Sequence, residues 1–153
     1  MRRFLSSIVN NVDSKGRVSV PAPFRQVLAA RDITDLYALQ SIVHPAIDVG
    51  GDDLLTQYER WMEEEAPFSQ AYDDLSLLAY GDGTYLKFDP EGRITVNDFI
   101  RAHTGITDRV LFVGRRDYFQ LWEPSRFEAY RAEMRQRMIA RQSSRGVSQS
   151  TPE

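Results

Sequence analysis

Two stretches of the chain, DSKGRVSVP (Asp13–Pro21) and DPEGRITVN (Asp89–Asn97), follow one pattern, D-x-x-G-R-[VI]-[ST]-V. The second begins 76 residues after the first, and an arginine follows each at the same offset, Arg25 and Arg101. A match of this length indicates an internal duplication. Two copies predict one fold made of two related halves, because a solenoid would need a longer array.

Each copy has the side chains of a tight turn followed by a half-buried strand. An aspartate can bond the backbone two residues further on, Pro90 presets a turn dihedral, and the glycine of each copy suits a left-handed position. A β-prone run precedes each turn, at residues 4–12 and 84–88. Because side chains alternate along a strand, the pattern predicts a hairpin whose exit strand buries its valines and displays Arg17 or Arg93.

Further elements are expected at matching places in both copies. Phe24, Val27 and Leu28 share one helical face after the first turn, while Asn97 suits the N-cap and Gly105 the C-terminal stop of the second short helix. The other expected elements are strands 36–39, 46–49, 110–113 and 118–122, a helix capped by Asp52 or Asp53, a helical connector at 67–80, a turn at 81–83, and a last helix begun by a Ser125–Glu128 capping box.

Composition excludes several classes of protein. A hydrophobic fraction of 42% with 11% aromatic residues in 153 residues is sufficient for a packed core. The absence of cysteine excludes disulfide frameworks, thiolate metal sites and cysteine nucleophiles. No apolar run approaches the roughly 18 residues of a membrane span, so we expect a cytoplasmic protein without a membrane partner.

Charge is distributed unevenly along the chain. The net charge of −3 argues mildly against a nucleic-acid partner. However, residues 1–31 contain six basic side chains and one acid, Asp13, whereas acids collect between residues 52 and 74. A folded chain could therefore present a basic face and an acidic face, and local potential governs binding.

The two repeated stretches, VDSKGRVSVPAPFR and FDPEGRITVNDFIR, resemble the AbrB-like swapped-hairpin motif of DNA-binding proteins. Two such motifs in a chain of this length, with GRRDYFQLWE near the end of the second, are similar to the MraZ family of bacterial regulators. The resemblance covers roughly residues 3–140. It implies an α+β, mainly β fold in which the duplicated motifs form a pseudo-two-fold intrachain β-barrel flanked by helices.

The resemblance also implies a function. Members of this family form ring-like homo-oligomers that bind short direct repeats in double-stranded DNA, upstream of the division and cell-wall gene cluster, and usually repress it together with their own gene. The expectation is therefore a sequence-specific transcriptional regulator located at the nucleoid, with no enzyme activity, no cofactor, no metal and no small-molecule substrate. The DNA-binding candidates are basic residues of both copies and of the N-terminus, namely Lys15, Arg17, Arg25, Arg93, Arg101 and Arg3.

Some of these residues have simpler interpretations. Arg17 could serve only to pin its turn, and Arg93 could be satisfied by Asp89 and by Glu91, which stands where the first copy has Lys15. The six arginines after residue 125 are more simply a solvent-exposed face, or partners for the acidic run 63–65 across a subunit boundary. His44 and His103 lie too far apart in the chain to indicate a zinc site.

Two other functional classes are alternatives to a DNA-binding regulator. The first is an antitoxin-like protein-binding module of the AbrB type, and the second is a hydrolase, for which the sequence shows no nucleophile and base. The expected domains are 7–54, with a helix continuing to about 66, and 83–126, joined by a connector at 67–82. A C-terminal helix at 127–142 and a disordered tail at 143–153 complete the chain.

Overall fold

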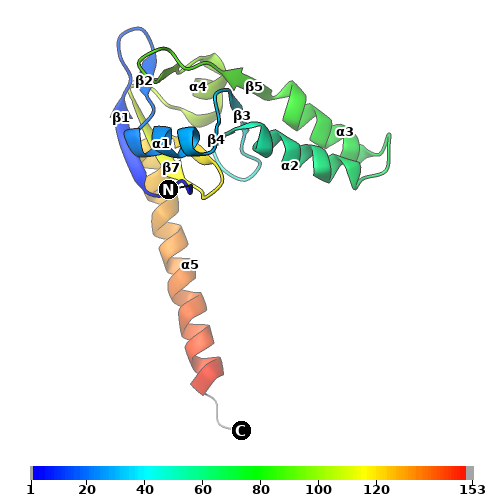
Figure 1. The fold of residues 1–153 in the computed structure, drawn as a ribbon. Coiled ribbons are helices and arrows are strands. Elements are labelled where there is room, and N and C mark those ends of the chain that lie inside the picture. Colours follow the sequence, from blue (N-terminus) through cyan, green and yellow to red (C-terminus); the bar gives the residue numbers. More distant parts are fainter. Residues whose placement is uncertain (1, 151–153) are drawn as a thin grey trace.

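The computed structural model describes residues 2–150, with side chains as far as residue 146, and it has an α+β fold dominated by one sheet (Figure 1). The strands are β1 (Ser7–Asn11), β2 (Arg17–Ser19), β3 (Leu36–Gln40), β4 (Ala46–Gly50), β5 (Gly83–Leu86), β6 (Arg93–Thr95), β7 (Arg109–Gly114) and β8 (Phe119–Trp122). The helices are α1 (Ala22–Ala30), α2 (Asp52–Glu63), α3 (Gln70–Ser76), the π-helical η1 (Leu77–Gly81), α4 (Asp98–Thr104) and α5 (Pro124–Ser150).

Six strands form one antiparallel sheet in the order β1-β7-β8-β4-β3-β5. Strands β1, β3 and β4 of the first copy correspond to β5, β7 and β8 of the second. Exchanging corresponding strands reverses the order of the sheet, so the two copies are related by a pseudo-two-fold arrangement. At the centre, β4 pairs with β8 from Ala46–Trp122 to Val49–Phe119. The edge strands change sides, since β1 of the first copy pairs with β7 of the second and β5 of the second pairs with β3 of the first. The two copies are therefore interleaved.

The expected β-barrel is not closed. In the described chain, β1 and β5 each pair on one side only, and they form the two edges of the six-stranded sheet. The return strands β2 and β6 are three residues long and lie in a separate two-stranded sheet, which we call the ribbon. Strands β2 and β6 are each bounded by a turn and a helix and are too short to bridge the two edges of the large sheet. The sheet therefore stays open, and the ribbon covers one of its faces.

The ribbon also changes the expected hairpins. Strand β2 does not form a ladder with β1; instead it pairs with β6, with Val18 opposite Ile94. Backbone hydrogen bonds extend the pairing symmetrically, from Val20 N to Gly92 O at 3.0 Å and from Val96 N to Gly16 O at 2.7 Å. The predicted facing of the side chains is confirmed, because Val18 and Val20 are buried while Arg17 is partly exposed.

The hydrophobic core follows the alternation of side chains along the strands. Val110 and Phe112 of β7 face the ribbon, α1 and α4, where most of the buried residues lie. Leu111 and Val113 face the opposite side and pack with Trp122 against the beginning of α5. The central sheet is therefore covered on both faces, and the ribbon is fastened to it by the buried Val18 and Ile94.

The short helices begin and end largely as the sequence predicts. The side chain of Asn97 accepts a hydrogen bond from Ile100 N, and Gly105 closes α4 in the left-handed conformation at φ 77°. The expected caps of the two longer helices are wrong. Gly51 is the N-cap of α2, so Asp52 and Asp53 lie in its first turn, where carboxylates favour the helix dipole.

At α5 the carboxylate of Glu123, and not the hydroxyl of Ser125, accepts hydrogen bonds from the amides of Ser125 and Arg126. Glu128, the expected second member of the capping box, pairs instead with Arg131. The acid before Pro124 thus takes the capping role that the sequence pattern assigned to Ser125, two residues later.

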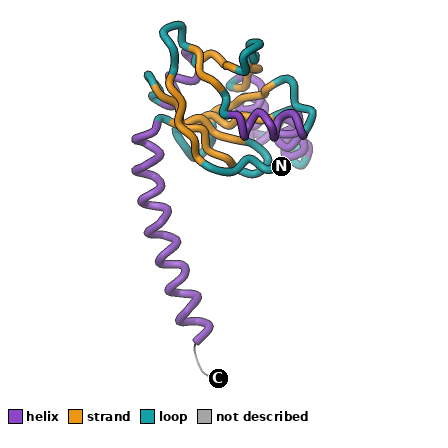
Figure 2. Tube along the Cα trace, turned by 60° about the vertical axis from the view of Figure 1, so that its left-hand side comes forward, coloured by secondary structure: helices purple, strands orange, loops and turns teal. Residues whose placement is uncertain are grey.

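Two helical elements project from the sheet (Figures 1 and 2). Helices α2 and α3 form an arm on one side, and α5 extends far from the sheet on another. Helix α5 continues to Ser150, through part of the stretch expected to be a loose tail. Elongating an existing helix costs little compared with nucleating one, so weak helix formers can be included. Residues 151–153 of that expected tail lie outside the described residues.

The expected division into domains 7–54 and 83–126, joined by a connector at 67–82, remains a prediction. The strands of both expected domains lie in one sheet, so the sheet itself does not mark a boundary between them. The connector contains α3 and η1, in agreement with the helical character expected of it. Within residues 2–150, none of the helices combines the length and apolarity needed to cross a membrane.

Candidate nucleic-acid interface

The first repeated turn is held together by one carboxylate. Asp13 Oδ1 accepts hydrogen bonds from the amides of Lys15 at 2.9 Å and Arg17 at 2.8 Å, and its Oδ2 accepts one from Arg17 Nε at 2.8 Å. Gly16 has φ 80°, which favours glycine. Asp13 thereby fixes the turn and places the Lys15 side chain in solvent at its tip.

The second turn repeats this geometry with a different charge. Asp89 Oδ1 accepts from the amides of Glu91 at 3.0 Å and Arg93 at 2.9 Å, and Oδ2 accepts from Arg93 Nε at 2.6 Å. Gly92 has φ 77°. The two stretches that match in sequence therefore form matching turns, but an exposed glutamate replaces the lysine at the second tip.

The guanidinium groups of the two turns differ in their surroundings. Arg93 lies near three carboxylates, those of Asp89 at 2.6 Å, Glu91 at 3.3 Å and Asp13 at 3.9 Å. Arg17 pairs with Asp13 alone and donates to it through Nε, and within the described residues its terminal nitrogens make no hydrogen bond. Arg17 thus pins its turn and still presents the outer edge of its guanidinium.

These pairs lower the pKa values of both aspartates. The amide hydrogen bond from Arg17 is the main reason that the pKa of Asp13 lies below its ordinary 3.8. For Asp89, desolvation raises the pKa, but the amide and guanidinium of Arg93 together outweigh it and lower the pKa. Each carboxylate therefore stabilises its turn at neutral pH, and this contribution is lost as pH falls through the lowered pKa.

Arg25 lies at the second turn, although the sequence groups it with the first. Its side chain crosses over Gly92, where a Cβ atom would come within 2.8 Å of Arg25 Cδ. Within the described residues it makes no ion pair or side-chain hydrogen bond, and it is exposed. The pairing of β2 with β6 explains the exchange, because it brings the end of β2 and the start of α1 to Gly92.

Arg101 has the corresponding place beside Gly16 but a different environment. Its Nη1 donates to the carbonyls of Thr107 at 2.7 Å and Ile106 at 3.2 Å, and its Nε donates to Val96 at 3.3 Å. These bonds tie the start and end of α4 together. The guanidinium is therefore largely engaged in holding the backbone.

Arg3 is not brought to the turns. It precedes β1 and adjoins the bridge between Phe4 and Arg116, whereas the Asp13–Gly16 turn follows β1 at its other end. This N-terminal end is held by Arg31, whose guanidinium donates to Arg2 O at 2.6 Å and to Asp117 at 2.9 Å.

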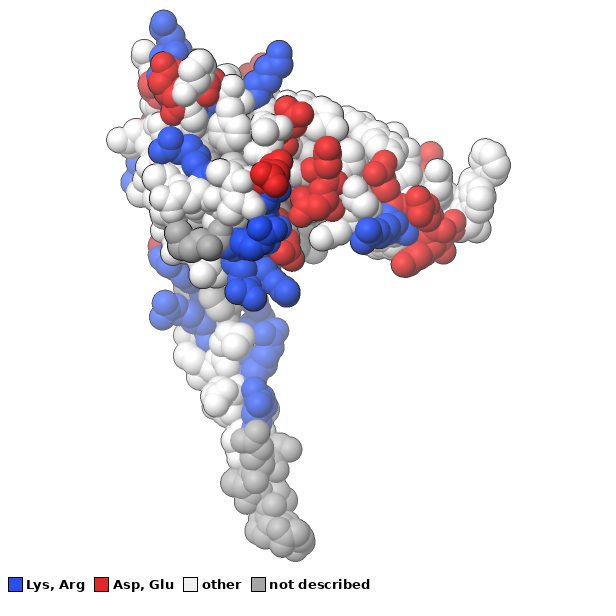
Figure 3. Space-filling model, viewed as in Figure 1, with Lys and Arg blue, Asp and Glu red and all other residues white. Residues whose placement is uncertain are grey.

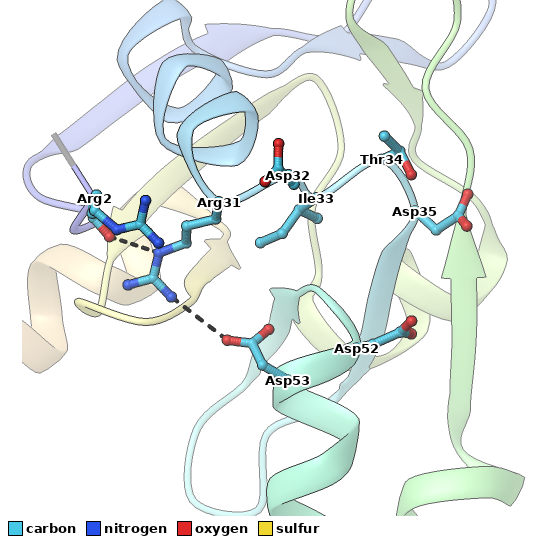
Figure 4. Close-up of a pocket in the computed structure, with 8 residues that line it drawn as sticks. All are labelled: Arg2, Arg31, Asp32, Ile33, Thr34, Asp35, Asp52 and Asp53. Carbon is cyan, nitrogen blue, oxygen red and sulfur yellow. Dashed lines mark hydrogen bonds and ion pairs between the residues drawn. The ribbon is translucent and has the colours of Figure 1, made fainter.

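The pocket beside Arg31 has two basic side chains on one side and aspartates on the other (Figure 4). Arg31 reaches across it to Asp53 at 3.5 Å. Arg31 also lies over the ring of Phe4, 5.7 Å from its centroid. We interpret this pocket as an ion-pair network that fastens the N-terminal segment to α2.

The turn end carries charges of both signs. Five of the DNA-binding candidates (Lys15, Arg17, Arg25, Arg93, Arg101) lie at the turns with three acids of the repeated stretches (Asp13, Asp89, Glu91), and Asp108 and Arg109 adjoin the first turn. Figure 3 shows the loop between β1 and β2 with a basic side chain at its tip and acidic ones directly beneath. The positive charge available to a ligand is therefore concentrated on Lys15, Arg17 and Arg25.

No metal-binding cluster accompanies these residues. Within residues 2–150 there is no group of three or more histidine, aspartate and glutamate side chains arranged to hold a metal ion. His103 and His44 meet, with His103 Nε2 3.1 Å from the carbonyl oxygen of His44, although they are 59 residues apart. The contact is with a backbone atom, so it joins α4 to the β3–β4 loop.

One connection at the turns was not anticipated from the sequence. Asn10 Nδ2 donates to Ser19 O at 2.8 Å. This side-chain bond joins β1 to the last residue of β2, although the two strands form no ladder with each other. The sign of this role in the sequence is that Asn10, whose side-chain amide can donate a hydrogen bond, stands only three residues before Asp13. Together, the repeated turns, the ribbon and the interleaved sheet define the class of small α+β proteins in which two matching strand–turn–strand segments of one chain exchange strands.

Known proteins narrow this class to one family. Residues 79–149 match the family model described as "MraZ protein, putative antitoxin-like". Three relatives carry the name Transcriptional regulator MraZ. That of Rhizobium johnstonii is 53% identical over 88% of this chain and 93% of its own length. That of Rhizobium rhizogenes is 54% identical over 89% and 93%, and that of Xanthobacter autotrophicus 44% over 90% and 88%. The chain belongs to the MraZ family.

Proposed function

We propose that this protein is a transcriptional regulator that binds double-stranded DNA with the end of the fold formed by the two repeated turns. The observation that carries the proposal is that basic side chains without an opposing second acid lie at both turns of the ribbon, Lys15 and Arg17 at the first turn and Arg25 at the second. The name of the protein's relatives, Transcriptional regulator MraZ, supports DNA as the target. Basic side chains on a rigid ribbon suit phosphate binding.

Each of the three residues has a distinct part in the proposed contact. Lys15 and Arg25 have exposed, unpaired ends in the described structure and would bind backbone phosphates. The terminal nitrogens of Arg17 could donate to O6 and N7 of a guanine, while its Nε remains on Asp13. Because Arg93 is surrounded by three carboxylates, the second copy would contribute mainly to the structure.

The target and the regulatory effect are part of the same proposal. The resemblance to the MraZ family supports short direct repeats upstream of the division and cell-wall gene cluster, including the protein's own gene, and repression as the outcome. One subunit offers three basic side chains, enough for about two or three phosphates. Tight binding would therefore need several subunits on several repeats, each adding an intramolecular contact.

A salt series on operator DNA tests this mechanism. If three subunits bind through six to nine phosphates, the slope of log Kobs against log salt should be about −5 to −8. We expect duplexes with three repeats from the region upstream of the gene to bind at least about tenfold more tightly than one-repeat duplexes. Fluorescence anisotropy measures both quantities, and equal affinity for one and three repeats would contradict the multivalent mechanism.

A contact between copies is supported by the two projecting elements. The α2–α3 arm, residues 52–76, carries eight acids and one base, and the α5 residues 124–146 carry six bases and two acids. Figure 3 shows that the charged side chains are mostly red along the arm and blue along the coloured part of the helix, on different sides of the molecule. The arm of one subunit could therefore pack on α5 of the next, and a head-to-tail contact of this kind forms a ring when the rotation between neighbours closes.

Light scattering at micromolar concentration tests the assembly. We expect a mass several times the 17.6 kDa of one chain. Replacing Glu63, Glu64 and Glu65 by lysine should lower that mass, since the arm would then repel the helix of its neighbour. The matched control replaces the three acids with glutamine, which removes charge without reversing it and should have a smaller effect. A wild-type mass of one chain would refute the assembly.

A further inference from the structure

A pocket of about 310 Å³ lies between α2 and the sheet, on the face opposite the ribbon. Its lining comes from β4, α2 and the residue before β8, namely Asp48, Leu54, Gln57, Tyr58, Trp61 and Tyr118. The size is at the lower end of the range for small-molecule sites. Trp61 is 45% exposed at this pocket, so one of its walls is accessible from solvent.

Asp48 contributes a buried carboxylate to this pocket. The residue is 6% exposed and stands in the middle of β4, a central strand of the sheet. Its Oδ1 accepts a hydrogen bond from Gln120 Nε2 at 2.8 Å. The amide of Gln120 is held in this orientation because its Oε1 accepts from Arg115 Nη1 and Trp122 Nε1, both at 2.9 Å.

The second oxygen of Asp48 is not matched in the same way. Within the described residues, Oδ2 has no hydrogen bond, and no basic nitrogen lies within 4.0 Å of the carboxylate. Arg115 reaches it only through Gln120. Buried carboxylates are normally paired with a cation, because removing the charge from water is unfavourable. Burial accordingly raises the pKa of Asp48.

The walls of the pocket suit a cation with an apolar stem. The rings of Tyr58 and Trp61 lie 6.3 Å apart and are inclined by 34°. Aromatic faces attract ammonium and guanidinium groups, and tryptophan does so most strongly. Leu54 adds an apolar surface beside them.

We propose that this pocket binds an organic cation, a guanidinium or primary ammonium group, whose charge pairs with Oδ2 of Asp48 and whose stem packs on Tyr58 and Trp61. The cation could belong to a free small molecule or to an arginine side chain of a second copy. In either case the ligand meets the sheet on the face away from the ribbon, so this site is separate from the proposed DNA contact.

Titration of the full chain with butylguanidinium chloride tests the site. We expect saturable quenching of tryptophan fluorescence, and no saturable change with butylurea, which has a similar shape without the charge. Asp48→Asn keeps the shape of the side chain and should weaken binding at least tenfold. Asp73→Asn, at an exposed position on α3 outside the pocket, is the matched control and should bind as the wild type does.

A second variant and the oligomer mass complete the test. Trp61→Leu changes a half-exposed residue, so it should preserve the circular dichroism spectrum while weakening binding. Binding by this variant is measured by isothermal titration calorimetry, because the substitution removes the tryptophan at the pocket. If the natural cation is a second copy's arginine, Asp48→Asn and excess butylguanidinium will both lower the mass of the oligomer. If it is a free molecule, the mass will not change but the titration will saturate. Equal binding by Asp48→Asn and wild type, or no saturable binding together with an unchanged mass, overturns the proposal.

Discussion

The simultaneous replacement of Lys15, Arg17 and Arg25 by alanine should reduce affinity for operator DNA by about 100-fold or more at physiological salt. These are the basic residues at the turn end that are least engaged with the protein itself. Each lost phosphate contact lowers the salt slope by about one, and in a multivalent complex the loss is repeated in every bound subunit. Anisotropy with the upstream DNA measures the effect.

Single replacements divide the effect among the three residues. Arg17→Ala should remove discrimination between specific and random duplexes, because Arg17 is the candidate for reading a base. Arg93→Ala should change DNA affinity by less than about threefold, since three carboxylates already surround that side chain. Arg60→Ala, on the acidic arm, is the control. Undiminished DNA binding by the triple variant would exclude the turn end as the interface.

Replacement of Phe119 by alanine should cost about 3–5 kcal/mol of unfolding free energy. Phe119 is fully buried, and its ring lies 5.3 Å from those of Phe4 and Phe24 and 6.1 Å from that of Phe112. These four rings join the N-terminal segment, α1, β7 and β8, so a cavity there would loosen both copies. Urea denaturation followed by circular dichroism measures the loss.

Phe68→Ala is the matched control for this measurement. Phe68 is completely exposed at the end of the arm, so the same chemical change should alter the unfolding free energy by no more than about 0.5 kcal/mol. Both variants must be compared at one protein concentration, because assembly contributes to apparent stability. Equal losses in the two variants would contradict the assignment of the aromatic cluster as the core.

Local features of the fold could be predicted from the sequence because they depend on neighbouring residues. The bonds from Asp13 to its own turn, the left-handed Gly16 and Gly92, and the Asn97 cap follow from the chemistry of single side chains. The alternation of valines likewise predicted that Val18 would be buried. Turn chemistry and periodicity therefore predicted the turns, the short-helix cap and the buried face of the strand, but not the hairpin ladder of each copy or the caps of the two longer helices.

The partners of the strands could not be predicted in this way. Periodicity indicates which face of a strand is buried but not which strand lies beside it. The pairing of β2 with β6 is therefore visible only in the structure, and the place of Arg25 over Gly92 depends on that pairing. For the same reason, the sequence assigned Arg25 and Arg101 each to its own turn, whereas each lies at the other.

The interleaved sheet has a consequence for how the chain folds as it is synthesised. Strand β1 ends at residue 11, and its partner β7 begins at residue 109. Almost a hundred further residues must therefore be synthesised before β1 can pair. At about 5–20 residues per second, this delay is about 5–20 s on the ribosome. Neither half contains a complete sheet of its own. The first half therefore cannot complete the sheet before the second half is synthesised, and the pairing of β1 with β7 has to close a long loop, which slows folding.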